Sequence, residues 1–184
     1  GQRNKCICLE FLNNSEALCL FGTTDMSSFD DALEFRFKAD TTWADAHEDD
    51  KAAVTRLWNW IDSCKDDPAK FLAEYNQYFG NDIPFAWYLI TDYFMAVDNR
   101  AKNMMLATWD SLIWYFLPYD MDTLFGVRND SVLKYEYTIT HESFDDSIGS
   151  YAFAGHDSVL WELVRSCPDK LREVAETLRS NMSL

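Results

Sequence analysis

The strongest constraint on the fold is a helical segment, from Pro84 to about Val97, that is apolar on nearly every side. Asp82 and Pro84 supply its start signal, because proline fits the first helical turn, where no backbone N–H donor is needed. A helix without a polar face is stable only when other elements cover most of its surface. The chain is therefore expected to pack around this helix.

Two helices are predicted before this segment. The first follows an acidic stretch, 45–50, whose charges suit the positive end of a helix dipole. Its buried stripe consists of apolar residues at helical spacing, Val54, Leu57, Trp58 and Ile61. The second begins at Asp67 and Pro68 and ends at Gly80. Its apolar positions are Phe71, Leu72, Tyr75 and Phe79.

Two more helices are predicted near the C-terminus. Asp157 is a natural cap for a helix over residues 158–164. Pro168 starts a last helix, and its apolar stripe is Leu171, Ala175 and Leu178.

Strands are predicted at the N-terminus, where apolar and polar residues alternate. Residues 5–12 form one such run, and residues 17–21 form a second strand after an Asn-Asn turn. Residues 32–38 form a third strand with one solvent-exposed face.

A central hairpin is predicted after the apolar helix. Residues 104–109 and 112–117 flank Asp110-Ser111, a two-residue link typical of a tight turn. Antiparallel pairing brings the two ends of a hairpin side by side. Asn103 and Asp120 should therefore lie close together, although they are seventeen positions apart in the sequence.

The combined prediction is an α+β domain, mainly helical, that spans residues 1–184. It has a strand-rich antiparallel segment over 1–40 and a helical lobe over 41–184, with the hairpin 104–117 inside the lobe. The length suits one domain, and no repeat or linker indicates a second. A strand pattern that is already under way at residue 5 predicts a module of a longer protein.

Charge excludes several classes of partner. The net charge of −15 would repel nucleic-acid phosphates and anionic lipid headgroups, and no apolar run reaches the roughly 18 residues of a membrane span. We therefore expect a soluble protein that binds neither nucleic acid nor membrane. The five cysteines are odd in number and lack CxxC spacing, which favours reduced, buried thiols over a metal site.

Two polar segments carry the chemistry that the sequence suggests. Asp98 is followed five residues later by Asn103, and Asp120 and Asp122 follow the hairpin. An acid that positions a hydroxyl, together with an amide and an acid that hold a metal, is the inventory of a phosphoryl-transfer site. A structural interpretation stays open, in which Asp98 and Asn103 cap a helix end and Arg100 pairs with Asp120.

The region 85–126 resembles the C-terminal lobe of the spore-coat CotH family of atypical protein kinases. Such sequences run from a helix through Asp, Asn and an aromatic hairpin to an acidic pair before Phe-Gly. The matching residues are Asp98, Asn103, Trp114, Tyr119, Asp120, Met121, Asp122, Phe125 and Gly126. The step from Asp98 to Asn103 is also the step in the catalytic loop of ordinary protein kinases. Upstream agreement is looser, through Glu34 and Lys38.

The resemblance implies a role for each residue. Asp98 would deprotonate the acceptor hydroxyl of a protein substrate, and Asn103 and Asp120 would hold Mg²⁺ on the phosphates of ATP. Asp122 would be a second metal ligand or support the first. Arg100 or Lys102 would contact phosphate or neutralise the acids.

Two departures from kinases limit what the resemblance implies. A kinase needs a glycine-rich cover and a lysine that pairs with the nucleotide phosphates. The sequence has no glycine-rich loop after a strand, and Lys38 is a weak substitute for the lysine. The chain is thus expected to hold a candidate catalytic half without a nucleotide clamp.

A second resemblance concerns residues 95–137 and 154–161, which are similar to segments of large virion-associated proteins of tailed gut bacteriophages. It implies a non-catalytic structural or interaction module of a tail or capsid-associated protein as the alternative. The partners would then be the remainder of the same polypeptide or other virion proteins, and the chain would reside in a phage virion.

Overall fold

The computed structural model describes residues 5–11, 33–36, 41–94, 96, 99, 104–121, 124–126 and 159–182. The predicted strand over 17–21, which contains Cys19, lies outside these residues, as do Lys38 and Asp157.

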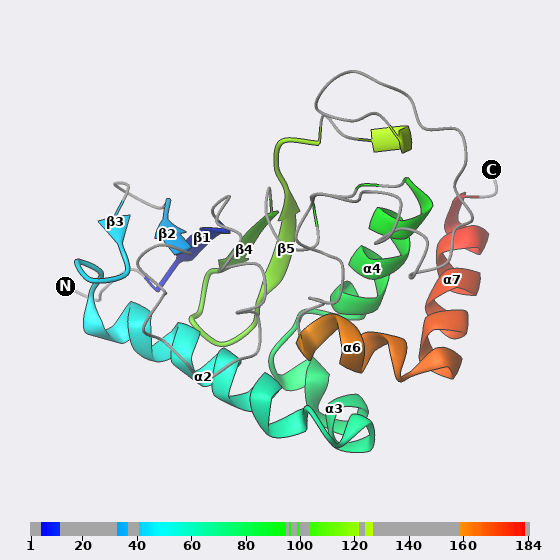
Figure 1. Ribbon diagram of the computed structural model, residues 1–184, viewed down its shortest axis with the longest axis horizontal. Coiled ribbons are helices and arrows are strands. Elements are labelled where there is room, and N and C mark those ends of the chain that lie inside the picture. The colour runs from blue at the N-terminus through cyan, green and yellow to red at the C-terminus, as the bar shows by residue number, and fades with distance from the viewer. Residues whose placement is uncertain are drawn as a thin grey trace.

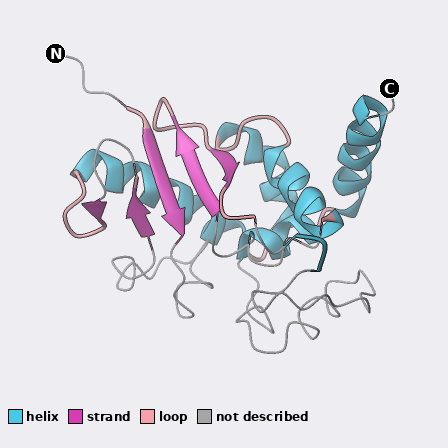
Figure 2. Cartoon of the chain, turned by 90° about the horizontal axis from the view of Figure 1, so that it is seen from above, coloured by secondary structure: helices cyan, strands magenta, loops and turns pink. Residues whose placement is uncertain are grey.

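The described strands form one antiparallel sheet in the order β3-β2-β1-β4-β5 (Figure 2). Their bounds are Ile7–Phe11 for β1, Leu33–Phe35 for β2, Thr41–Thr42 for β3, Met104–Thr108 for β4 and Tyr115–Pro118 for β5. Leu9 of β1 lies opposite Phe35 on one side and Leu106 on the other. The strands predicted over 5–12 and 32–38 and the predicted hairpin therefore belong to the same sheet, which confirms the α+β class.

The described helices comprise five α-helices and two short 3₁₀ turns. The α-helices are α2 (Glu48–Cys64), α3 (Pro68–Glu74), α4 (Ile83–Tyr93), α6 (Val159–Arg165) and α7 (Pro168–Met182). The 3₁₀ turns are η2 (Tyr75–Gln77) and η4 (Leu124–Gly126). Figure 1 shows α2 running below the strands, with α4, α6 and α7 grouped beyond β5. Within the described residues, no helix is both long and apolar enough to span a membrane.

One part of the core lies between the sheet and α2. The predicted stripe of α2 is confirmed, because Val54, Leu57, Trp58 and Ile61 are all completely buried. Trp58 stacks on Phe11 of β1, with ring centroids 5.9 Å apart. Burial of apolar surface on this scale is the main force that holds a helix on a sheet.

The start of α3 is confirmed, but its stripe is partly wrong. The Asp67 carboxylate accepts a hydrogen bond from the Lys70 amide at 3.0 Å, which caps the helix. Leu72 is 42% exposed, whereas Phe71 is completely buried. Consecutive residues of a helix point about 100° apart, and on α3 the direction in which Leu72 points is open to solvent.

Helix α4 ends at Tyr93, before the predicted end near Val97. Its last turn closes when the Phe94 amide donates to the Ile90 carbonyl at 3.0 Å, and the Ala96 amide then reaches back to the Thr91 carbonyl at 2.8 Å. Tyr93 is 72% exposed, so the helix is not covered at its C-terminal end.

Asp82 makes no side-chain cap on α4, contrary to the prediction. Its carboxylate instead accepts hydrogen bonds from the Tyr75 hydroxyl and from the Lys170 ammonium, the latter at 3.1 Å. Lys170 also pairs with Glu173 at 2.8 Å. Burial, with the Asp82 carboxylate beside it, raises the pKa of Tyr75 to about 12. Asp82 thus joins η2, α4 and α7 in one polar cluster.

The hairpin loop is longer than predicted, because β5 begins at Tyr115 rather than Leu112 and leaves residues 109–114 as the loop. The Asp110 carboxylate accepts from the Leu112 amide at 2.8 Å and the Ile113 amide at 2.9 Å. Burial opposes ionisation of Asp110, but these hydrogen bonds outweigh it, so its pKa is lowered. A side chain that bonds the following amides holds a wider turn than a two-residue link.

The C-terminal helices agree with the prediction. Helix α6 begins at Val159, and α7 begins at Pro168. The buried centre of the α7 stripe is Val174, which the sequence pattern missed, and Leu171 and Leu178 pack against the core beside it.

The four cysteines that the structure describes are not joined by disulfides, and Cys64 and Cys167 are buried. Burial raises the pKa of the Cys8, Cys64 and Cys167 thiols. These thiols are therefore held in the protonated form.

Candidate functional site

Of the site residues predicted from the sequence, Asp120 is the one that the structure describes. Asp98, Arg100, Lys102, Asn103 and Asp122 lie outside the described residues. The described residues on either side of them define how the two polar segments approach each other.

The two strands of the hairpin meet at the end where the site is predicted. Met104, the first residue of β4, lies opposite Pro118, the last residue of β5. The expectation that this pairing brings the hairpin ends together is confirmed for the two strands.

The backbone of Asn99, in the segment that follows α4, is held by two hydrogen bonds on the described residues. Its backbone N–H donates to the Ala96 carbonyl at 3.2 Å, and its backbone carbonyl accepts from the Trp87 indole N–H at 2.8 Å. Asn99 is completely buried, which is unusual for a polar side chain unless it is hydrogen-bonded.

The side chain of Asn99 bridges the two polar segments. Its Nδ2 atom donates a hydrogen bond of 2.9 Å to the carbonyl of Tyr119. Asn99 follows Asp98 in the sequence, and Tyr119 precedes Asp120. Asn99 was not predicted as a site residue, and its place beside Asp98 was the available signal.

A second contact joins the end of α4 to the segment after β5. The Phe125 amide donates to the Phe94 carbonyl at 2.7 Å, and the two rings meet edge to face with centroids 5.4 Å apart. Phe125 has a positive φ of 59° and remains 60% exposed. Tyr119 and Phe125, on either side of Asp120 in the sequence, are therefore each hydrogen-bonded to a residue at or beyond the C-terminal end of α4.

Asp120 is exposed and has a φ of 47°, in the left-handed region. Aspartate enters this region more readily than most residues, but the conformation is still unfavourable for an L-amino acid. Strained residues of this kind cluster at functional sites, where the surrounding contacts hold them. The arrangement presents an accessible carboxylate on a turn that is fixed from both sides.

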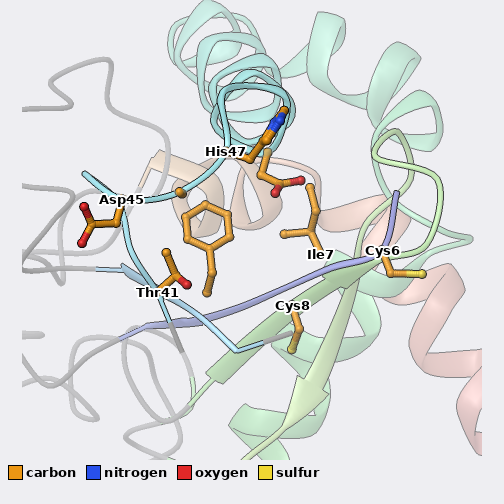
Figure 3. A pocket seen from close by; sticks show the side chains of 9 residues that line it. Cys6, Ile7, Cys8, Thr41, Asp45 and His47 are labelled. Atoms are coloured by element: carbon orange, nitrogen blue, oxygen red, sulfur yellow. The ribbon is translucent and has the colours of Figure 1, made fainter. Parts of the chain in front are cut away.

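A separate cavity of about 190 Å³ lies at the opposite end of the sheet (Figure 3). It is bounded by the start of β1, near Cys6 and Cys8, and by the start of α2, near His47 and Asp50. Ile7 pairs with Thr108, at the far end of β4 from Met104, so the cavity is remote from Asp120.

His47 is exposed and caps α2, since its Nδ1 atom accepts from the Asp49 amide at 3.2 Å. The described part of the chain contains no group of three side chains suited to hold a metal ion.

In a comparison with protein families, the model of the CotH kinase protein family aligns with residues 10–164. This span begins in β1 and ends in α6, and it includes both polar segments. It is wider than the region 85–126 on which the sequence resemblance rests. A search of curated proteins finds no match.

Proposed function

The chain belongs to the CotH kinase protein family, and from that premise we propose that it carries a metal-dependent phosphoryl-transfer site at Asp98, Asn103 and Asp120. In this proposal the chain is a kinase-like module that acts on a hydroxyl group of a protein substrate.

The observation that supports the proposal best is the hydrogen bond from Asn99 to Tyr119. It joins the sequence neighbours of Asp98 and Asp120, which belong to segments 20 residues apart. A phosphoryl-transfer site needs an acid near the acceptor and metal ligands near the phosphates, and so it needs these two segments together.

The proposed roles follow from the chemistry of each side chain. Asp98 accepts the proton of the acceptor hydroxyl while the hydroxyl oxygen bonds to the γ-phosphorus of ATP. The bond between the γ-phosphorus and the β-phosphate oxygen breaks, and ADP departs. Asn103 and Asp120 would hold Mg²⁺, and Asp122 would be a further ligand or support one. The bound ion would neutralise the charge on the phosphates.

The donor set fits Mg²⁺, which prefers carboxylate and carbonyl oxygens and retains several waters. Asp120 is exposed, so a hydrated ion can reach its carboxylate. Arg100 and Lys102 are proposed to face the phosphates. Lys38 is a weak substitute for the lysine that pairs with ATP in kinases, so tight nucleotide binding is expected to need a further segment.

The test is nucleotide binding measured by calorimetry, with ADP titrated in the presence and absence of Mg²⁺. We expect Mg²⁺-dependent binding in the wild-type chain and its loss in Asp120→Ala. Asp169→Ala is the matched control, because Asp169 is an exposed carboxylate on α7 whose pairing with Arg172 is local. Equal binding in wild type and Asp120→Ala would contradict the proposal.

The alternative is a non-catalytic interaction module of a larger assembly, and a different observation favours it. Trp109 is 60% exposed and Leu112 is 50% exposed on the hairpin loop that Asp110 holds. Rigidly held apolar residues at the surface are typical of contact sites. In this case no nucleotide would bind, and Trp109→Ser would weaken association with the rest of the polypeptide or with virion proteins, as measured by co-sedimentation.

A further inference from the structure

We infer that Asn99 is a positioning residue that holds Asp120 in its left-handed conformation and fixes the spacing between the two polar segments. The expected effect of Asn99 on metal binding rests on the proposed function. Its effect on the backbone of Asp120 rests on the described residues alone.

The hydrogen bond from Asn99 acts on the peptide group that precedes Asp120. The Tyr119 carbonyl and the Asp120 amide belong to one planar unit, so a donor that fixes this carbonyl also fixes the plane. The φ angle of Asp120, 47°, is the rotation between that plane and the rest of the residue. Without the donor, the plane is able to turn and Asp120 relaxes toward the more favourable negative φ.

Asn99 can exert this control because hydrogen bonds also hold its own backbone. Its side chain donates to Tyr119, its amide donates to Ala96 and its carbonyl accepts from the Trp87 indole. Complete burial removes water as a competing partner for these groups.

The contacts of Asn99 also continue through the core to β5. Trp87 of α4 holds Asn99 through its indole N–H, and its ring stacks on Phe116 of β5 with centroids 5.5 Å apart. Phe116 lies three residues before Tyr119, which receives the Asn99 hydrogen bond. Each member is therefore held on two sides, and the distance between the end of α4 and the end of β5 is fixed by packed groups rather than by the loops alone.

The experiment compares Asn99→Ala and Asn99→Asp with the wild-type chain by two readouts. NMR measures the three-bond coupling between the amide and α protons of Asp120, which reports its φ angle. Electron paramagnetic resonance measures Mn²⁺ binding in the presence of ADP. Aspartate has nearly the size of asparagine but cannot donate when ionised, so it separates the lost donor from lost volume.

We expect the Asp120 coupling to change in both variants, and Mn²⁺ affinity to fall roughly tenfold, as when the residues that orient metal ligands are removed. Ile61→Ala is the stability control, because Ile61 is completely buried on α2 and its truncation destabilises the fold. This control should keep both the wild-type coupling and the wild-type Mn²⁺ affinity.

The positioning role of Asn99 and the proposed function can be rejected separately. An unchanged Asp120 coupling in Asn99→Ala would overturn the positioning role, whatever the metal does. Suppose that the Asp120 coupling changes in the Asn99 variants but the wild-type chain binds no Mn²⁺ in the presence of ADP. This result would support the positioning role and reject the proposed function. A changed coupling with unchanged Mn²⁺ affinity would overturn the link between the position of Asp120 and metal binding.

Discussion

The interface of α2 with the sheet and the segment around Asp120 are stabilised in opposite ways. The first is a stripe of completely buried apolar side chains, including Leu57 and Trp58, that packs on the strands. The second depends on individual hydrogen bonds, from Asn99 to Tyr119 and from Phe125 to Phe94, and on the ring contact between Phe94 and Phe125. Stability therefore resides mainly in the first region, and the proposed chemistry requires the specific geometry of the second.

The largest expected effect comes from the core. Trp58→Ala should lower the free energy of unfolding by about 3–5 kcal/mol, because it removes a completely buried ring and leaves a cavity. Urea denaturation measures the loss. A variant that unfolds at the wild-type urea concentration would show that this interface does not dominate stability.

An intermediate effect is expected from the polar cluster at Asp82. Tyr75 has a raised pKa of about 12. Its contribution to the free energy of unfolding is therefore complete below pH about 10 and is lost as the pH rises toward 12. The pKa of Lys170 is also raised, mainly by Glu173 and further by Asp82. Its contribution to stability is therefore also lost as the pH rises above the ordinary pKa of lysine.

Thermal unfolding between pH 9 and pH 12 tests this prediction. Tyr75→Phe should flatten the alkaline loss of stability by an amount on the order of 1–2 kcal/mol. The same pH dependence in wild type and Tyr75→Phe would contradict it.

A similar or smaller effect is expected in the hairpin loop. Asp110→Ala removes the acceptor for the Leu112 and Ile113 amides and should cost about 1–2 kcal/mol. Urea denaturation measures the cost, and ADP binding should not change because the loop is at the far end of the hairpin from Asp120. Loss of nucleotide binding in this variant would show that the two regions are coupled.

The smallest effect on stability has the opposite sign. Asp120→Gly should raise the free energy of unfolding by about 1 kcal/mol, because glycine has no penalty at the φ of 47° that Asp120 adopts. The same change should abolish Mg²⁺-dependent ADP binding. A decrease in stability, measured by urea denaturation, would show that the Asp120 side chain contributes to the fold.

The sequence predicted the fold where one pattern determined the structure. The period of Val54, Leu57, Trp58 and Ile61 leaves one face for the core, and Asp67 with Pro68 marks a helix start without reference to other elements. The pairing of β4 with β1 was not predicted, because strand order depends on contacts between distant segments.

The errors arose where a side chain formed an unexpected contact. Asp110 was interpreted as half of a tight turn, but its carboxylate bonds two amides and widens the loop. Asp82 was interpreted as a cap, but Tyr75 and Lys170 take its carboxylate. Both contacts depend on tertiary structure or on the exact path of the loop, which local propensity does not contain.

The residue types of the candidate site came from the sequence and the family resemblance, whereas the contacts that join its segments came from the structure. Asp98, Asn103 and Asp122 remain predictions, because they lie outside the described residues. The resemblance to virion-associated proteins likewise stays a prediction.

The most direct test of the proposed site is a calorimetric titration of ADP at increasing Mg²⁺ concentrations, with wild type, Asp120→Ala and Asn103→Ala compared. The account predicts that ADP affinity rises with Mg²⁺ in the wild-type chain and that this dependence disappears in both variants. The same ADP affinity with and without Mg²⁺ in the wild-type chain, or no ADP binding at all, would contradict it.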